Sequence, residues 1–138
     1  MKKDKKDLEI EELTTNWKRA LADYQNLVKR SEAEKIEVVA YANTNLILKL
    51  LVVLDHFEKA QNYLKDSGLD LAIKQFRGVL LEEGLQEIEA MGKDFNPLEM
   101  EAVEVQKEGE NNKVVQVIAK GYRLKGKIIR VAKVKVSQ

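Results

Sequence analysis

The fold is decided by residues 10–48, which read IEELTTNWKRALADYQNLVKRSEAEKIEVVAYANTNLIL and contain neither glycine nor proline. Alternate steps of three and four residues select twelve positions in this stretch, and nine of them are apolar. A mean step of 3.5 residues is the heptad period, which keeps one face of a long helix on a partner over many turns. The pattern therefore predicts a long helix paired with a second copy of the chain. This heptad stripe consists of Ile10, Leu13, Trp17, Ala20, Tyr24, Leu27, Ser31, Glu34, Val38, Tyr41, Asn45 and Leu48.

The stripe is imperfect, because Ser31, Glu34 and Asn45 are polar. Polar residues at such positions cost stability, so we expect a loose pair rather than a strict zipper. The alternative is a helical hairpin that folds back within one chain. A hairpin needs a turn, and no strong turn signal precedes Asp66-Ser67-Gly68, so the intermolecular pair is preferred. The residues expected at the dimer interface are Ile10, Leu13, Trp17, Tyr24, Leu27, Val38, Leu50, Leu54 and Phe57.

Two further helices are expected after the long one, which starts near Leu8. Asn43-Thr44-Asn45 combines poor helix propensity with good capping side chains and predicts a break. The helix from about Leu46 to Leu64 is apolar over most of its surface, which favours burial in a four-helix bundle of two chains. A third helix is predicted from Leu69 to about Ala90, with an end or a bend at Gly84.

Beyond Gly92 the hydrophobic period changes from helical to alternating, which predicts a small β-domain. Glu108–Asn112 is predicted to be a hairpin loop and Lys125-Gly126 a tight turn. The predicted strands are Ala102–Gln106, Val114–Ala119, Tyr122–Leu124, Lys127–Arg130 and Ala132–Val136.

The strand Val114–Ala119 carries apolar residues on both faces. Simple alternation places Val115 and Val117 on one face and Val114 and Ile118 on the other. Either one face packs inward while the other is offered to a partner, or a sandwich core covers both. The pattern favours neither.

The expected fold class is α+β, with a long N-terminal coiled-coil helix, a helical-bundle dimerisation region and a small C-terminal all-β domain. These parts are expected to cover residues 1–45, 46–92 and 93–138, respectively.

Composition favours a binding protein over an enzyme. The chain has no cysteine and a single histidine, His56, so thiolate chemistry and a conventional zinc site are excluded. It also lacks a glycine-rich phosphate loop and a nucleophile elbow. We therefore expect no catalytic residue, no metal and no cofactor.

The sequence gives no indication of a membrane partner. Its longest apolar run, Leu46–Leu54, is interrupted by Lys49 and falls short of the ~20 residues that span a bilayer. The first residues resemble neither a signal peptide nor a transit peptide. We expect a cytoplasmic location.

Charge is distributed unevenly, although the net charge is only +1. Residues 113–138 carry eight basic side chains and no acidic one. Such a module favours an acidic partner surface, and the alternative is a solvated strand face whose lysines protect sheet edges. Nucleic-acid binding is a third possibility, but Tyr122 is the only aromatic residue in this segment, too few for a stacking platform. We expect no nucleic-acid partner.

Four spaced motifs lie in order within residues 20–136. In the helical half they are Asn26-x-x-Lys29-Arg30 and Leu50-Leu51-Val52-Val53-Leu54-Asp55 with Phe57-Glu58-Lys59-Ala60. In the β-domain they are Phe95-Asn96-Pro97 with Met100-Glu101-Ala102-Val103, and Gly121-Tyr122 with Gly126 and Ile129-Arg130. This constellation resembles the GrpE family, the nucleotide exchange factors of DnaK-type chaperones.

The resemblance implies a parallel homodimer that binds the ATPase domain of a DnaK-type chaperone, opens its nucleotide cleft and accelerates ADP release. It also implies a role in the heat-shock stress response, with long helices that melt reversibly. The chaperone-binding residues it implies are Lys29, Arg30, Phe95, Val114, Ile118 and Val136. Asn96, Pro97, Gly121, Tyr122, Gly126 and Arg130 are expected to fix turn geometry and strand packing. A second hypothesis is a structural coiled-coil tether without exchange activity.

Overall fold

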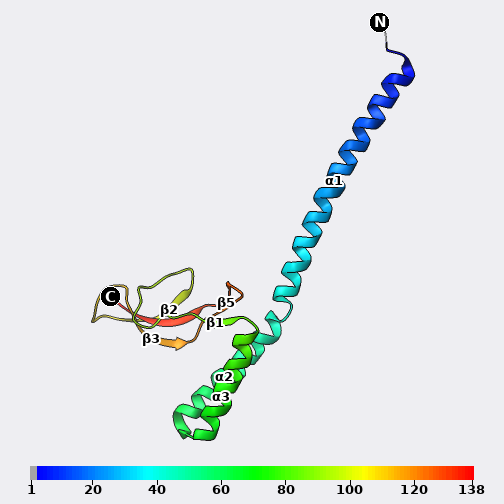
Figure 1. Cartoon of the computed structure of the whole chain (residues 1–138). Helices are drawn as coiled ribbons and strands as arrows, with labels where there is room; N and C mark the ends of the chain where they lie inside the picture. The colour runs from blue at the N-terminus through cyan, green and yellow to red at the C-terminus, as the bar shows by residue number, and fades with distance from the viewer. Residues whose placement is uncertain (1–2) are drawn as a thin grey trace. The chain divides into compact units, whose positions relative to one another are not determined.

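The computed structural model describes residues 3–138, which form three helices and six strands (Figure 1). The chain divides into one unit that ends at Tyr41 and another that runs from Ala42 to Gln138. The predicted α+β class is confirmed, with helices first and strands last. In order, the elements are α1 Lys5–Tyr41, α2 Thr44–Leu64, α3 Ser67–Glu82, β1 Leu85–Glu87, β2 Met100–Gln106, β3 Val114–Ala119, β4 Tyr122–Leu124, β5 Lys127–Arg130 and β6 Ala132–Ser137.

Helix α1 is continuous over 37 residues, which corresponds to about 56 Å at 1.5 Å per residue. The absence of glycine and proline explains this continuity. Within Lys5–Tyr41 no residue is buried by the rest of the chain. Most helical stability in proteins comes from packing of an amphipathic face, and α1 has no such packing within its own unit.

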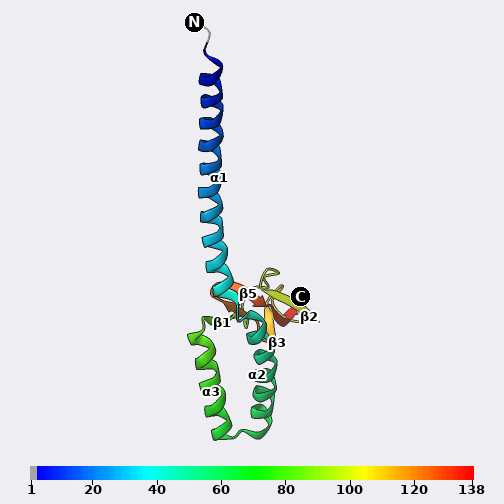
Figure 2. The same cartoon turned by 90° about the vertical axis from the view of Figure 1, so that its right-hand side faces the viewer.

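Helices α2 and α3 form a hairpin in which they lie side by side (Figure 2). The predicted break is confirmed, because Ala42-Asn43 forms a non-helical step and α2 starts at Thr44. Lys65 adopts a left-handed conformation with φ 51° at the end of α2. The Asp66 side chain then caps α3 by accepting a hydrogen bond from the Leu69 N–H at 2.8 Å.

The predicted helix over Leu69–Ala90 is wrong beyond Glu82, where α3 ends. Gly84 has a φ of +92°, which favours glycine and stops the helix. Its carbonyl accepts a hydrogen bond from the Lys125 N–H at 2.9 Å, and this contact starts the pairing of β1 with β4. Leu85 and Ile88 have helical spacing, but Leu85 is buried in β1 and Ile88 is buried directly after it, so the spacing alone was misleading.

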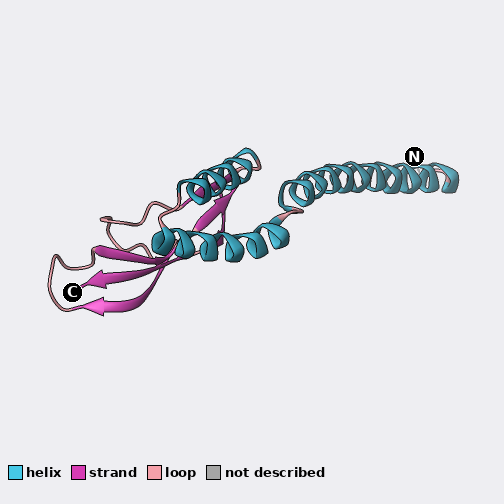
Figure 3. Ribbon diagram, turned by 90° about the horizontal axis from the view of Figure 1, so that it is seen from below, coloured by secondary structure: helices cyan, strands magenta, loops and turns pink. Residues whose placement is uncertain are grey.

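The strands, called here the β-domain, form two three-stranded sheets (Figure 3). One is antiparallel with the order β1-β4-β5, and the other has the order β2-β6-β3. In the second sheet, β6 pairs in parallel with β2 and antiparallel with β3. Lys125 and Gly126 both have positive φ, as the tight turn predicted between β4 and β5 requires.

The predicted hairpin loop at Glu108–Asn112 is wrong, because β2 and β3 do not pair with each other. They lie on opposite sides of β6, so the loop connects the two outer strands of a sheet. The Asn112 N–H donates to the Ser137 carbonyl at 2.8 Å, and the buried Ser137 hydroxyl donates to the Lys113 carbonyl at 3.3 Å. These hydrogen bonds therefore hold the loop against the last residues of β6. The sequence alone did not predict this contact, because the loop and β6 are far apart in the chain.

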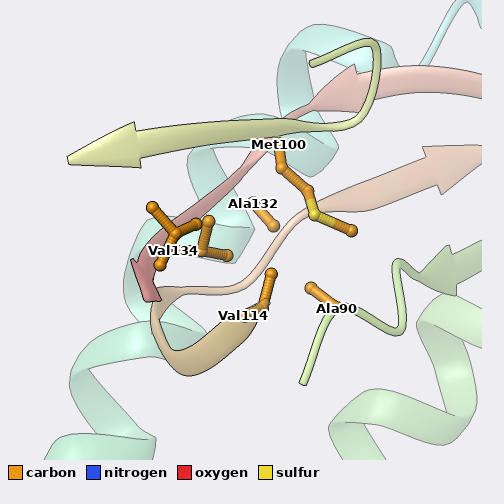
Figure 4. Close-up of a cluster of buried hydrophobic side chains, with 6 residues drawn as sticks. Ala90, Met100, Val114, Ala132 and Val134 are labelled. Atoms are coloured by element: carbon orange, nitrogen blue, oxygen red, sulfur yellow. The ribbon is translucent and has the colours of Figure 1, made fainter. Parts of the chain in front are cut away.

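The core of the β-domain is made of small and medium-sized apolar side chains from several strands (Figure 4). Phe95 and Val117 are partly buried and pack against this cluster. Because the cluster contains two alanines and three valines, the backbones can approach closely. Its buried members are Ala90, Met100, Val114, Ala132, Val134 and Val136.

The tightest backbone contact involves Gly121, next to β4. A Cβ atom there would meet the Ala132 nitrogen and lie 2.8 Å from the Val131 carbonyl carbon and 2.9 Å from the Ala132 Cα. These are backbone atoms in a well-packed region, so they cannot move aside cheaply.

We predict that Gly121→Ala lowers the free energy of unfolding by about 1–3 kcal/mol, because the added methyl group overpacks the site. The control is Gly78→Ala in α3, where an added Cβ meets no atom within 4 Å. That change should raise stability by about 0.5–1 kcal/mol. Urea unfolding followed by circular dichroism at one fixed protein concentration measures both, and equal stability of the two variants would contradict the prediction.

Candidate protein-interaction surfaces

The heptad stripe on α1 is accessible along its whole length. The predicted interface residues Ile10, Leu13, Trp17, Tyr24, Leu27 and Val38 are all exposed. Exposed apolar side chains that recur along one helix in this way are typical of helices that pair with another chain.

The α2–α3 hairpin also leaves apolar residues uncovered. Ile47, Leu51 and Leu54 are buried within the chain, whereas a neighbouring stripe on α2 remains accessible. Leu54 is fully buried, so its predicted place at the dimer interface is corrected: it belongs to the core of its own chain. Phe57 is exposed and Leu50 is half-buried. The exposed apolar residues of the hairpin are Leu46, Val52, Val53, Phe57, Tyr63, Leu64, Leu71, Val79 and Leu81.

Lys29 and Arg30, the residues implied on the long helix, are both exposed. The Arg30 Nε lies 3.7 Å from the Glu34 carboxylate one helical turn away, and both side chains are largely exposed. Surface pairs of this kind contribute little to stability, so Arg30 remains accessible to an acidic partner.

The β-domain residues implied by the resemblance occupy different environments. Ile118 is 42% exposed, and Phe95 is half-buried against the core. Val114 and Val136 are only 2% and 7% exposed, so the expectation that they supply a contact surface is corrected: they fill the core. Register shifts in β3 between Val114 and Gln116 and between Val117 and Ala119 change the simple alternation, which explains why Val114 and Ile118 do not share a face.

Arg130 of β5 makes the most extensive polar contacts between the hairpin and the strands. Its two terminal nitrogens donate to the two carboxylate oxygens of Asp55 in α2, at 2.7 and 3.0 Å. Its Nε donates to the Lys120 carbonyl at 2.8 Å. The guanidinium carbon lies 5.1 Å from the centre of the Tyr122 ring, within cation–π range. Arg130 is therefore an internal contact rather than a free surface cation.

Glu58, three residues beyond Asp55 on α2, extends these contacts. Its carboxylate accepts a hydrogen bond at 3.0 Å from the Arg77 Nε in α3. It also lies 3.4 Å from the Lys120 ammonium group, which is 3.8 Å from Glu87 in β1. Carboxylates from α2 thus contact cations from α3, β5 and the loop before β4.

The basic run at the C-terminal end is largely neutralised within the chain. At least five of its eight cations form ion pairs with acidic residues from earlier segments. The run therefore presents much less positive potential than its sequence suggests, which argues against an anionic partner such as nucleic acid. The pairs are Lys113–Asp94, Lys120–Glu58, Arg123–Glu99, Arg130–Asp55 and Lys135–Glu104.

Metal ions in proteins are held by groups of His, Cys, Asp or Glu side chains. Within residues 3–138 no group of three or more His, Cys, Asp or Glu side chains could hold a metal ion. His56 is exposed on α2. A hollow of about 530 Å³ is lined mainly by Leu54, Leu80, Leu81 and Leu85, with Arg77, Tyr122 and several polar side chains.

One helical stretch, Lys5–Leu64, contains an 18-residue window with mean hydropathy 1.6, long and apolar enough to cross a membrane. Only 11% of that window is buried. The stretch includes the break at Ala42-Asn43 and the apolar stripes described above. The core helix of a soluble protein and a signal sequence pass the same test, so one such stretch is weak evidence for a membrane segment.

Tyr122 has a perturbed environment. Burial raises the pKa of its phenol above the ordinary value, the carboxylates of Glu58 and Glu87 raise it further, and Arg130 lowers it. The folded protein therefore holds the phenol proton more tightly than the unfolded chain does. This contribution to stability is fully present below about pH 10, the unfolded pKa, and is lost as pH rises through the folded value.

We predict that the melting temperature falls more steeply above about pH 10 in the unmodified protein than in Tyr122→Phe, which has no phenol to ionise. Thermal melts of both proteins between pH 8 and 11.5 measure the difference, and lysine deprotonation affects both alike. Parallel curves over the whole range would show that Tyr122 is not the responsible group.

Comparison with known proteins identifies related sequences along the whole chain. The family model described as GrpE matches residues 1–138. A protein named Protein GrpE from Alkaliphilus oremlandii is 37% identical over 142 aligned residues, covering 96% of this chain and 76% of the relative. A second, from Methanosphaera stadtmanae, is 38% identical, covering 93% of this chain and 78% of the relative.

Proposed function

The chain belongs to the GrpE family, and we propose that it is a nucleotide exchange factor that binds the ATPase domain of a DnaK-type chaperone and accelerates ADP release. The observation that carries the proposal is the family match over the whole chain. It is supported by the exposed apolar side chains of α1 and of the hairpin, which are suited to binding another protein.

The proposed mechanism is a population shift. A protein that binds the open nucleotide cleft better than the closed one favours opening by the difference between the two affinities. By reciprocity, ATP that favours closure weakens the binding of this protein. Lys29 and Arg30 would meet acidic surface of the chaperone, and Ile118 would supply apolar contact.

The working unit in this proposal is a cytoplasmic homodimer. The exposed heptad stripe would pair the long helices, and the exposed apolar residues of α2 and α3 would complete a four-helix bundle. We retain the division into residues 1–45, 46–92 and 93–138 as a proposal. Strand β1 belongs to the middle segment by its position in the chain, but it pairs with β4 of the last segment.

The alternative is a structural tether, which shares the paired helices. The long exposed stripe of α1 favours it, because that stripe explains dimerisation without requiring exchange. The two functions differ in one measurable property: a tether leaves the rate of ADP release unchanged, whereas an exchange factor raises it.

We predict that the protein accelerates release of a fluorescent ADP analogue from a DnaK-type chaperone in stopped flow. Lys29→Glu and Ile118→Asp should each reduce this acceleration about tenfold at limiting concentration, as loss of an interface anchor does. An unchanged nucleotide release rate with the folded dimer would refute the exchange function and favour the tether.

Each variant has a matched control. Val103→Asp introduces the same carboxylate on β2 at a side chain that is also 42% exposed, and Lys35→Glu reverses an exposed charge elsewhere on α1. Both controls should retain most of the acceleration. If they lose as much as Ile118→Asp and Lys29→Glu, the effect is general and the assignment of these two residues is wrong.

We predict a dimer in sedimentation equilibrium, twice the 15.8 kDa of one chain. Val38→Asp should raise the dimer dissociation constant about tenfold or more, since burying a valine contributes about 1.5–3 kcal/mol. The control is Ile36→Asp, which changes an exposed apolar residue of α1 outside the heptad stripe. Similar weakening by both changes would argue against this stripe as the interface.

A further inference from the structure

We propose that Asp55 and Arg130 are positioning residues, and that their ion pair sets the orientation of the β-domain on the α2–α3 hairpin. The inference rests on the proposed exchange function, because it explains how that function obtains a fixed geometry. Both residues lie in the unit that runs from Ala42 to Gln138, so their contact is internal to one compact unit.

The geometry of the pair fixes an angle as well as a distance. A guanidinium group that donates through two nitrogens to two oxygens of one carboxylate is held in a common plane. The two distances, 2.7 and 3.0 Å, are those of a bidentate pair. The side chains are only 21% and 28% exposed, which reduces screening by water and salt.

Arg130 is itself immobilised from the side of the strands. Its Nε is bound to the Lys120 carbonyl, and its guanidinium stands over the Tyr122 ring. With these contacts in place, the two terminal nitrogens face Asp55. The guanidinium therefore behaves as part of the β-domain, while Asp55 is fixed on α2.

The pair also determines where Ile118 lies. A hollow of about 200 Å³ separates α2 from β3, and Asp55, Glu58, Ile118 and Lys120 are among its lining residues. The Lys120–Glu58 ion pair spans the same gap at 3.4 Å. Fixing Arg130 on Asp55 therefore fixes the exposed Ile118 side chain relative to the hairpin.

Loss of the pair should broaden the range of β-domain orientations without unfolding either part. The apolar cores of the hairpin and of the β-domain do not include these two side chains. A partner that contacts both the helices and Ile118 would then bind only those molecules in which the β-domain has the right orientation. The entropy lost when the β-domain is held in that orientation would weaken binding.

The first test measures orientation without any chaperone. The chain has no cysteine, so Lys49→Cys on α2 and Gln116→Cys on β3 accept two spin labels at exposed positions. Double electron–electron resonance, with labelled chains diluted in unlabelled protein, gives the distance distribution within one chain. We expect one narrow distribution with Asp55 present and a broader or shifted one with Asp55→Asn.

The matched control is Asp70→Asn, which makes the same chemical change in the exposed Asp70–Lys74 pair of α3, 2.8 Å long. It should leave the distribution unchanged.

Arg130→Lys keeps the charge but loses the planar fork, so it should broaden the distribution less than Asp55→Asn does. It also serves as the test variant if Asp55→Asn proves unable to fold. Distributions identical to that of the unmodified protein would overturn the proposal.

The second test measures exchange. We expect Asp55→Asn to raise the concentration for half-maximal ADP release about tenfold, with helix content and dimer mass retained. The double variant Asp55→Asn with Arg130→Lys should need no higher concentration than Asp55→Asn alone, because both changes remove the same interaction.

Altered orientation with unchanged exchange would overturn the positioning role. If the unmodified protein itself fails to accelerate ADP release, the proposed function fails, while the distance measurement still decides whether the pair sets the orientation.

Discussion

The constraint on which this structure depends is an apolar stripe that the chain cannot bury by itself. Helix α1 has no buried residue over its 37 positions, yet hydrophobic side chains recur along it with the heptad period. The hydrophobic effect makes such a surface stable only against another apolar surface. Helix α1 therefore lacks a core, whereas the α2–α3 hairpin and the β-domain each have buried apolar side chains.

Local signals in the sequence predicted most of the elements. The absence of glycine and proline before Gly68 predicted the continuous helix, and Lys125-Gly126 predicted the tight turn. Errors arose where distant segments decide the structure. Leu85 and Ile88 fit a helical period but lie in β1 and directly after it, because Gly84 ends α3 and β4 pairs with β1.

The candidate surfaces were harder to predict than the elements. A valine in a short strand can face the core or the solvent, and the register shifts of β3 buried Val114 while exposing Ile118. The basic run also looked like a surface feature, although most of its cations are paired with acids far away in the sequence. Charge pairing between distant segments leaves no local trace, so only the fold revealed it.

The place of β6 between β2 and β3 has a consequence for biosynthesis. The central strand of this sheet is the last to be translated, and its two neighbours have no partner in the sheet until it arrives. Contacts between residues so distant in the chain form slowly. In the proposed homodimer, the helices would leave the ribosome and start to associate while the sheet is still incomplete, so the order of synthesis would favour pairing of the helices before maturation of the β-domain.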